Sequence, residues 1–81
     1  MARISAGSDK EGALIGLGEA IRARRKAMGL SQEAMSDKSE IDRSHYGKIE
    51  RGERNVTLLN VLRIAAAIGC KPSDLLVDAG L

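Results

Sequence analysis

Apolar residues recur every three or four positions along most of the chain, which is the spacing that gives a helix one apolar face. The first such stripe predicts a helix over residues 14–28, which Gly29 ends as a C-terminal cap. The side chains expected to point inward are Leu14, Leu17, Ile21, Arg25 and Met28. Residues 1–11 lack this periodicity, and we expect them to form a flexible tail ahead of one folded domain over residues 12–81.

Four further helices are predicted from residues that favour helix N-termini. Ser31, Asp42 and Thr57 each carry a side-chain oxygen that can accept a hydrogen bond from a first helical turn, and Pro72 suits the first position of a last helix. The predicted helices cover residues 32–39, 43–51, 58–68 and 72–78. Tyr46 is the one aromatic residue, so the core must be aliphatic, which suits packed helices. We therefore expect an all-α fold, a compact five-helix bundle.

Composition excludes several classes of function. The 81 residues leave room for one domain, and 43% hydrophobic residues are too many for a disordered chain. One Cys and one His cannot supply a disulfide or a metal cluster, so we expect no metal, no cofactor and no enzyme activity. No apolar run reaches the length of a signal peptide or membrane span, which predicts a cytoplasmic protein. The formal net charge of +2 means that any DNA-binding surface is a local patch.

Three stretches of the chain resemble one known family. They are Ser31-Gln32-Glu33, the segment from Tyr46 to Asn55, and the helix that closes at Ile68-Gly69. Together they are similar to the Xre-type, or phage-repressor-like, helix-turn-helix family, and the segment from Tyr46 to Asn55 is most similar to controller proteins of restriction-modification systems. The resemblance implies a helix-turn-helix formed by the second and third helices. It also implies a dimeric transcription regulator that binds an operator in double-stranded DNA.

The predicted third helix has one polar face that is free to contact DNA. At about 100° per residue, this face carries Arg43, Ser44, Gly47, Lys48 and Arg51, and the opposite face carries Tyr46, Ile49 and Glu50. The planar fork of the Arg43 side chain suits guanine O6 and N7, so we expect Arg43 to read a base. The family pattern adds Ser44 and His45 beside base edges, with Lys48 one turn further on. The missing side chain at Gly47 would let the helix backbone approach the DNA closely.

Other residues are expected to position the protein on the phosphate backbone. Gln32 lies at the start of the second helix, where backbone amides form an anion site, and Arg51 and Asn55 lie at the other side of the motif. The resemblance also implies that Arg25 and Glu50 form a partly buried ion pair. We expect this pair to be structural, because breaking it would leave a charge unpaired.

The sequence departs from the family pattern at two positions. Glu40 stands in the turn where the family usually has Gly in a left-handed conformation, at a penalty of about 1 kcal/mol. Tyr46 replaces the usual aliphatic residue. Both departures leave open the shape of the turn and the angle of the third helix.

Apolar residues in the last helix and tail predict a homodimer. Leu75, Leu76, Val77 and Leu81 supply more apolar surface than a small core needs, although closing the core explains part of it. Two recognition helices would then meet successive major grooves about 34 Å apart, so the operator is expected to be an inverted repeat. Such a dimer would block or recruit RNA polymerase, with no small-molecule ligand. The alternative is an antitoxin or adaptor that uses the same fold to bind another protein.

Overall fold

The computed structural model describes residue 9 and residues 12–81, and these form five α-helices. The helices are α1 (Ala13–Ala27), α2 (Gln32–Ser39), α3 (Arg43–Glu50), α4 (Leu58–Ile68) and α5 (Pro72–Asp78). The prediction of an all-α five-helix fold is confirmed, and each helix begins and ends within one residue of its expected bounds. The expected tail over residues 1–11 lies outside the described residues, apart from Asp9.

The helices begin where side chains satisfy the first backbone amides. Ser31 Oγ accepts a hydrogen bond from the Ala34 amide at 3.0 Å, and the Asp42 and Thr57 side chains cap α3 and α4 in the same way. The Asp9 carboxylate accepts hydrogen bonds from the first two amides of α1, at 2.9 and 2.8 Å. Local sequence therefore determines where each of these helices starts.

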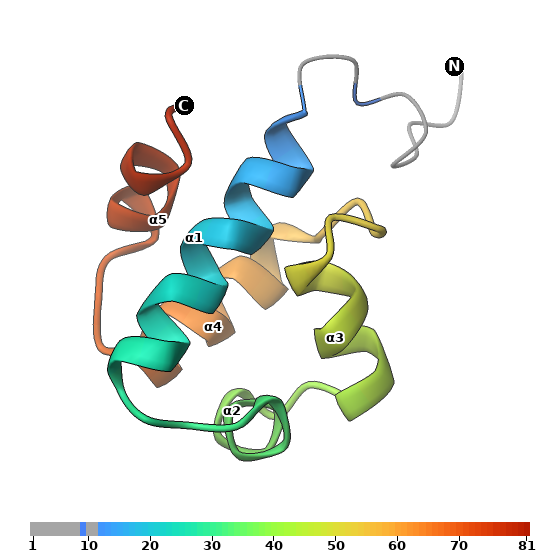
Figure 1. Ribbon diagram of the computed structural model, residues 1–81, viewed down its shortest axis with the longest axis vertical. Helices are drawn as coiled ribbons and strands as arrows, with labels where there is room; N and C mark the ends of the chain where they lie inside the picture. The colour runs from blue at the N-terminus through green and yellow to red at the C-terminus, as the bar shows by residue number, and fades with distance from the viewer. Residues whose placement is uncertain (1–8, 10–11) are drawn as a thin grey trace.

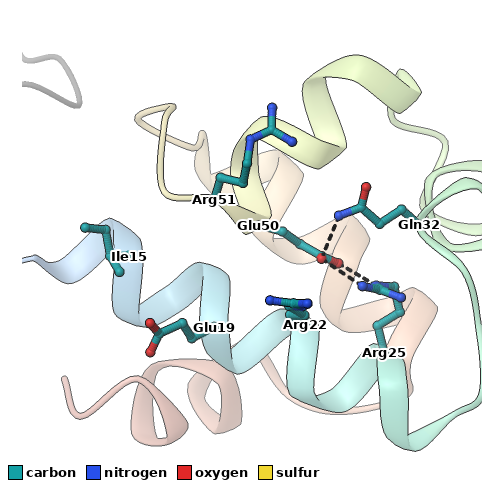
Figure 2. Close-up of a pocket in the computed structure, with 7 residues that line it drawn as sticks. All are labelled: Ile15, Glu19, Arg22, Arg25, Gln32, Glu50 and Arg51. Atoms are coloured by element: carbon teal, nitrogen blue, oxygen red, sulfur yellow. Dashed lines mark hydrogen bonds and ion pairs between the residues drawn. The ribbon is translucent and has the colours of Figure 1, made fainter.

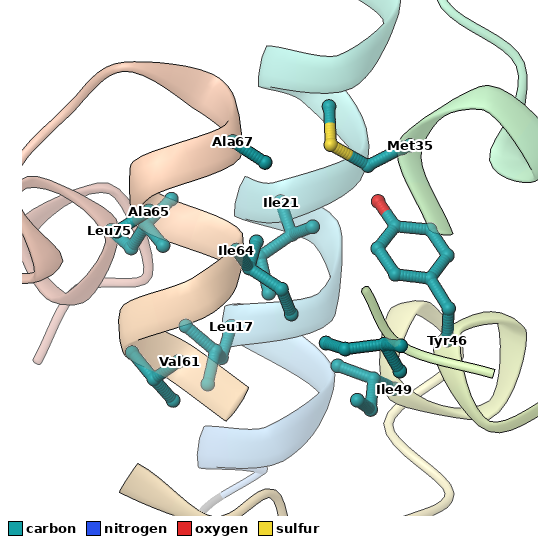
Figure 3. Packing of buried hydrophobic residues seen from close by; sticks show 11 residues of the cluster. Leu17, Ile21, Met35, Tyr46, Ile49, Val61, Ile64, Ala65, Ala67 and Leu75 are labelled. Atoms are coloured by element: carbon teal, nitrogen blue, oxygen red, sulfur yellow. The ribbon is translucent and has the colours of Figure 1, made fainter. Parts of the chain in front are cut away.

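Helix α1 runs through the middle of the bundle, with α3 and α5 on either side and α4 behind it (Figure 1). Helix α2 packs on α3 and α4 near the C-terminal end of α1. The core fills the space between these helices and is aliphatic except for the Tyr46 ring (Figure 3). Its most deeply buried large side chains are Tyr46, Ile21, Met35, Ile64 and Leu75. This core holds α3 by its inner side and leaves Arg43 and Ser44 at the start of the helix exposed, whereas Gly47 is buried.

The turn between α2 and α3 keeps a left-handed residue although glycine is absent. Glu40 has φ 58° and ψ 37°, and the amide of Ile41 bonds back to the Ser36 carbonyl oxygen at 3.0 Å. Glu40 thus adopts the conformation that glycine adopts readily at the end of a helix. The substitution leaves strain in the turn and does not change its type.

Glu40→Gly is therefore expected to raise the free energy of unfolding by about 0.5–1 kcal/mol, because glycine relieves the left-handed strain. Lys38→Gly, two residues earlier on the exposed side of α2, should lower it by about the same amount through lost helix propensity. Urea denaturation of both variants measures these shifts. A loss of stability in Glu40→Gly would contradict this account of the turn.

Candidate nucleic-acid interface

The two sides of α3 face different surroundings. Tyr46, Ile49 and Glu50 are buried against the rest of the bundle. Arg43 and Ser44 are exposed at the start of the helix, as is Arg51 directly after it. We call the residues Arg43, Ser44, Gly47, Lys48 and Arg51 the outward face of α3. Because the inner side is locked in the core, this face is presented on a rigid support.

A hollow of about 530 Å³ lies over the outward face of α3. It is lined by residues at the start of α2 and along α3, most of which the sequence predicted to contact bases or phosphates. Its lining is Gln32, Asp42, Arg43, Ser44, Gly47 and Arg51. Five of these six residues were predicted to contact DNA, and the sixth, Asp42, is the N-cap of α3.

Gly47 forms the floor of this hollow and is covered by two neighbouring side chains. A Cβ atom on Gly47 would lie 3.2 Å from Arg51 Nη1 and 3.5 Å from Gln32 Oε1. Both atoms are ends of flexible side chains, so the backbone becomes accessible when those side chains turn aside. Close approach to Gly47 thus requires movement of Arg51 and Gln32, which the sequence did not indicate.

Three other predicted DNA contacts lie outside the lining of the hollow. His45 is half-buried, and its Nε2 atom is 3.4 Å from the Asn60 side-chain nitrogen, so it lies at the edge of α3 nearest α4. Lys48 is half-buried on α3, and Asn55 is exposed in the segment between α3 and α4. These three residues are therefore not part of the hollow's lining.

The exposed arginines of the interface pair with acids that are also exposed. Arg43 Nη1 lies 3.5 Å from Glu33 Oε2, and Arg51 forms an ion pair with Glu53. The hydrogen bond from Arg51 lowers the pKa of the Glu53 carboxyl below its usual value. Exposed pairs contribute little to stability and are screened by salt. Both guanidinium groups can therefore exchange these partners for a phosphate or a base.

A buried carboxylate behind the interface ties three helices together. Glu50, whose side chain is 1% exposed, accepts hydrogen bonds from Arg25 Nε at 2.7 Å and Arg25 Nη2 at 3.1 Å. It also accepts from Gln32 Nε2 at 3.0 Å and from the Tyr46 hydroxyl at 2.5 Å. Figure 2 shows Arg25 of α1 and Gln32 of α2 meeting at this carboxylate. The end of α3 is thereby held in one orientation relative to α1 and α2.

The hydrogen bonds in this cluster determine its protonation. Burial by itself would raise the pKa of Glu50, but hydrogen bonds from Arg25, Tyr46 and Gln32 outweigh burial and hold that pKa below its usual value. Burial and the neighbouring carboxylate both raise the pKa of Tyr46. Glu50 is therefore ionised and Tyr46 is a neutral donor at physiological pH. The hydroxyl of Tyr46 thus gives Glu50 a donor that an aliphatic residue could not supply.

Comparison with known proteins identifies the family. The helix-turn-helix family model matches residues 21–75, more than half of the chain. This chain is a member of the helix-turn-helix family. Control protein C.MunI of a Mycoplasma species is 39% identical over 57 residues, covering 70% of this chain and 77% of that protein. Control protein C.SmaI of Serratia marcescens is 38% identical over 65 residues, covering 80% of this chain and 77% of that protein.

A solved structure agrees with these relatives. The restriction-modification controller protein C.AhdI of Aeromonas hydrophila superposes with a TM-score of 0.75 at 45% identity, covering 76% of this chain and 94% of that one. The chain is thus a DNA-binding transcription regulator of the restriction-modification controller type and not an enzyme. In this helix-turn-helix protein, α2 and α3 are the two helices of the motif.

The helix-turn-helix protein also exposes apolar side chains on α4, on α5 and at Leu81 beyond α5. Leu76, Val77 and Leu81 are 40%, 71% and 62% exposed, whereas Leu75 is fully buried. The Leu75 side chain closes the core beneath α5, which is the part of this apolar cluster that core packing was expected to explain. The sequence analysis missed three exposed leucines on α4, which together with α1 packs against α5. They are Leu58, Leu59 and Leu62.

A signal for these leucines was present in the sequence. Helix α4 carries apolar residues all round, which is more than one buried face can use.

None of the described helices is long and apolar enough to cross a membrane. Within the same residues, no group of three His, Cys, Asp or Glu side chains could hold a metal ion.

Proposed function

We propose that this chain acts as a homodimer on an inverted-repeat operator and controls transcription of a restriction-modification system. The observation that carries the proposal is the division of α3, whose inner side is fixed by the core and by Glu50 while its outward face lines an open hollow. A helix held in this way fits the major groove, which is about 12 Å wide.

The residues of the interface divide into two roles. Arg43 stands at the start of α3, where its guanidinium can donate two parallel hydrogen bonds to guanine, and Ser44, His45 and Lys48 read or border neighbouring positions. Gln32, Arg51 and Asn55 contact backbone phosphates on either side and set the register of the protein on the duplex. Gly47 keeps the floor of the hollow low enough for close approach once the Arg51 guanidinium turns toward a phosphate.

The two subunits associate through exposed apolar residues of α4, of α5 and of the segment that follows α5. We call these residues, Leu58, Leu59, Leu62, Leu76, Val77 and Leu81, the leucine surface. A small monomer rarely leaves so many large apolar side chains in water, and a two-fold axis through such a surface buries it against the same surface of the second chain. The dimer acts in the cytoplasm, where it blocks or recruits RNA polymerase at the promoter it occupies.

Leu59→Asp is expected to weaken dimerisation at least about 10-fold, because it introduces a charge that the interface must desolvate. Ala27→Asp, which places the same charge at an exposed position of α1, should leave the dimerisation constant unchanged. Sedimentation equilibrium of both variants without DNA measures the effect. Equal dimerisation constants for Leu59→Asp and the unmodified chain would show that the leucine surface does not form the dimer interface.

The symmetry of the operator is tested with sites selected from a random duplex pool. The proposal predicts enrichment of inverted repeats, two chains bound per duplex, and half-site centres about one helical turn apart. Inserting five base pairs between the half-sites turns them to opposite sides of the duplex and should abolish tight binding. Enrichment of single, unrepeated sites that bind one chain would contradict the proposal.

A further inference from the structure

A second groove lies beside the interface, between α1 and the end of α3. Its volume is about 590 Å³, and Figure 2 shows its walls. It shares Gln32 and Arg51 with the hollow over the outward face of α3, so the two depressions are neighbours. The lining residues are Ile15, Glu19, Arg22, Arg25, Gln32, Glu50 and Arg51. Because this groove contains three arginines and two acids, we call it the arginine groove.

Some charged side chains of the arginine groove form ion pairs with described residues and others do not. Arg25 and Glu50 neutralise each other in the buried pair. Arg22 is exposed and forms no hydrogen bond or ion pair with any described residue. Glu19, Arg22 and Arg25 follow each other at three-residue spacing on α1 and therefore share one side of that helix. Among the described residues Arg22 is thus a cation without a partner, and it shares the groove with Gln32 and Arg51, the two residues proposed to contact phosphates.

Two further donors converge on the same groove. The side-chain nitrogen of Gln32 has two N–H groups, and one hydrogen bond from it reaches Glu50. Gln32 is also the first residue of α2, whose N-cap Ser31 leaves amides of the first turn directed outward. The pairing of Arg51 with exposed Glu53 can be exchanged for a phosphate. This combination of a guanidinium fork, an amide and a helix N-terminus suits a tetrahedral anion.

We propose that the arginine groove binds a backbone phosphate of the operator, with Arg22 as its main ligand and Gln32 and Arg51 on its other side. This inference rests on the proposed DNA-binding function and adds α1 to the contacting elements. Arg22 then anchors the strand outside the segment that α3 reads, and it contributes affinity without base preference. Glu19 opposes this binding, because it brings a negative charge into the same groove.

Salt titration of operator binding tests the role of Arg22. Arg22→Gln should weaken binding about 5- to 10-fold near 0.1 M salt and reduce the slope of log K against log salt by about 0.9 for each subunit that contacts DNA. The loss should be equal for operator and scrambled duplex. Glu19→Gln should strengthen binding to both duplexes. The matched control is Arg63→Gln, an exposed arginine of α4 outside the arginine groove, which should keep the original slope.

A single neutral methylphosphonate, placed in turn at each operator phosphate, locates the contact. The unmodified chain should lose affinity at the phosphate that Arg22 binds, and Arg22→Gln should show no further loss there. The proposal would be overturned by an unchanged salt slope in Arg22→Gln. It would also be overturned if the affinity lost through the methylphosphonate added to that lost through Arg22→Gln at every phosphate. If the unmodified chain did not prefer operator over scrambled duplex, the proposed function itself would fail. A chain that prefers its operator while Arg22→Gln keeps the original slope would refute only the arginine groove.

Discussion

Gly18→Ala is expected to lower the free energy of unfolding by at least about 3 kcal/mol. A Cβ atom on Gly18 would lie 2.3 Å from the carbonyl oxygen of Glu50 and 2.7 Å from that of Ile49. Both are backbone atoms at the end of α3, so no side chain can move aside to make room. The only relief is to separate α1 from α3, which opens the core at Leu17 and Ile49.

Gly47→Ala is the matched control, because it makes the same change at another helical glycine. The new methyl group would meet only the flexible ends of Arg51 and Gln32, so the variant should gain about 1 kcal/mol from helix propensity. Urea denaturation of the two variants should therefore give shifts of opposite sign. A Gly18→Ala variant as stable as the unmodified chain would mean that α1 and α3 are not in the close contact described here.

Arg25→Met is expected to lower the free energy of unfolding by about 3–5 kcal/mol at pH 7. The substitution removes both arginine donors from Glu50 and leaves a buried carboxylate with only Gln32 and Tyr46 as partners. It also removes the hydrogen bond from Arg25 Nη1 to the Leu30 carbonyl oxygen, which holds the link between α1 and α2. The orientation of α3 should loosen together with the stability.

The loss in Arg25→Met should depend on pH in a defined direction. The pKa of Glu50 is lowered in the folded chain, so its contribution is fully present above the usual carboxyl value of 4.5 and is lost as the pH falls below it. The difference in free energy of unfolding between the unmodified chain and Arg25→Met should therefore be smaller at pH 3.5 than at pH 7, as measured by denaturation at both pH values. Adding Glu50→Gln to Arg25→Met removes the unpaired charge and should restore part of the stability. A gap that widens at pH 3.5 would contradict the described pairing.

The helices could be predicted from the sequence because their boundaries depend on local chemistry. Ser31, Asp42 and Thr57 cap α2, α3 and α4 as their side chains suggested. Helical periodicity also predicted which side of α3 is buried. These are properties of neighbouring residues in the chain, so they do not require knowledge of tertiary packing.

Tertiary packing determines what the sequence could not predict. Tyr46 and Glu50 lie one turn apart on α3, so their hydrogen bond is local, but only the packing of α2 on α3 brings Gln32 to the same carboxylate. Leu75 and Leu76 are adjacent in the chain and similar in chemistry, and only the position of α5 buries the first and exposes the second. The close contact of Gly18 with the backbone of Ile49 and Glu50 likewise depends on how α1 lies against α3.

The most direct test of the interface compares base preferences for Arg43→Ala and Arg51→Ala over all single substitutions of the selected operator. If the outward face of α3 reads the duplex, Arg43→Ala should lose preference at one position in each half-site, worth about 1–3 kcal/mol. Arg51→Ala should bind every sequence more weakly and keep the original preferences. An Arg43→Ala variant with the same preference at every position as the unmodified chain would contradict base reading by Arg43 at the start of α3.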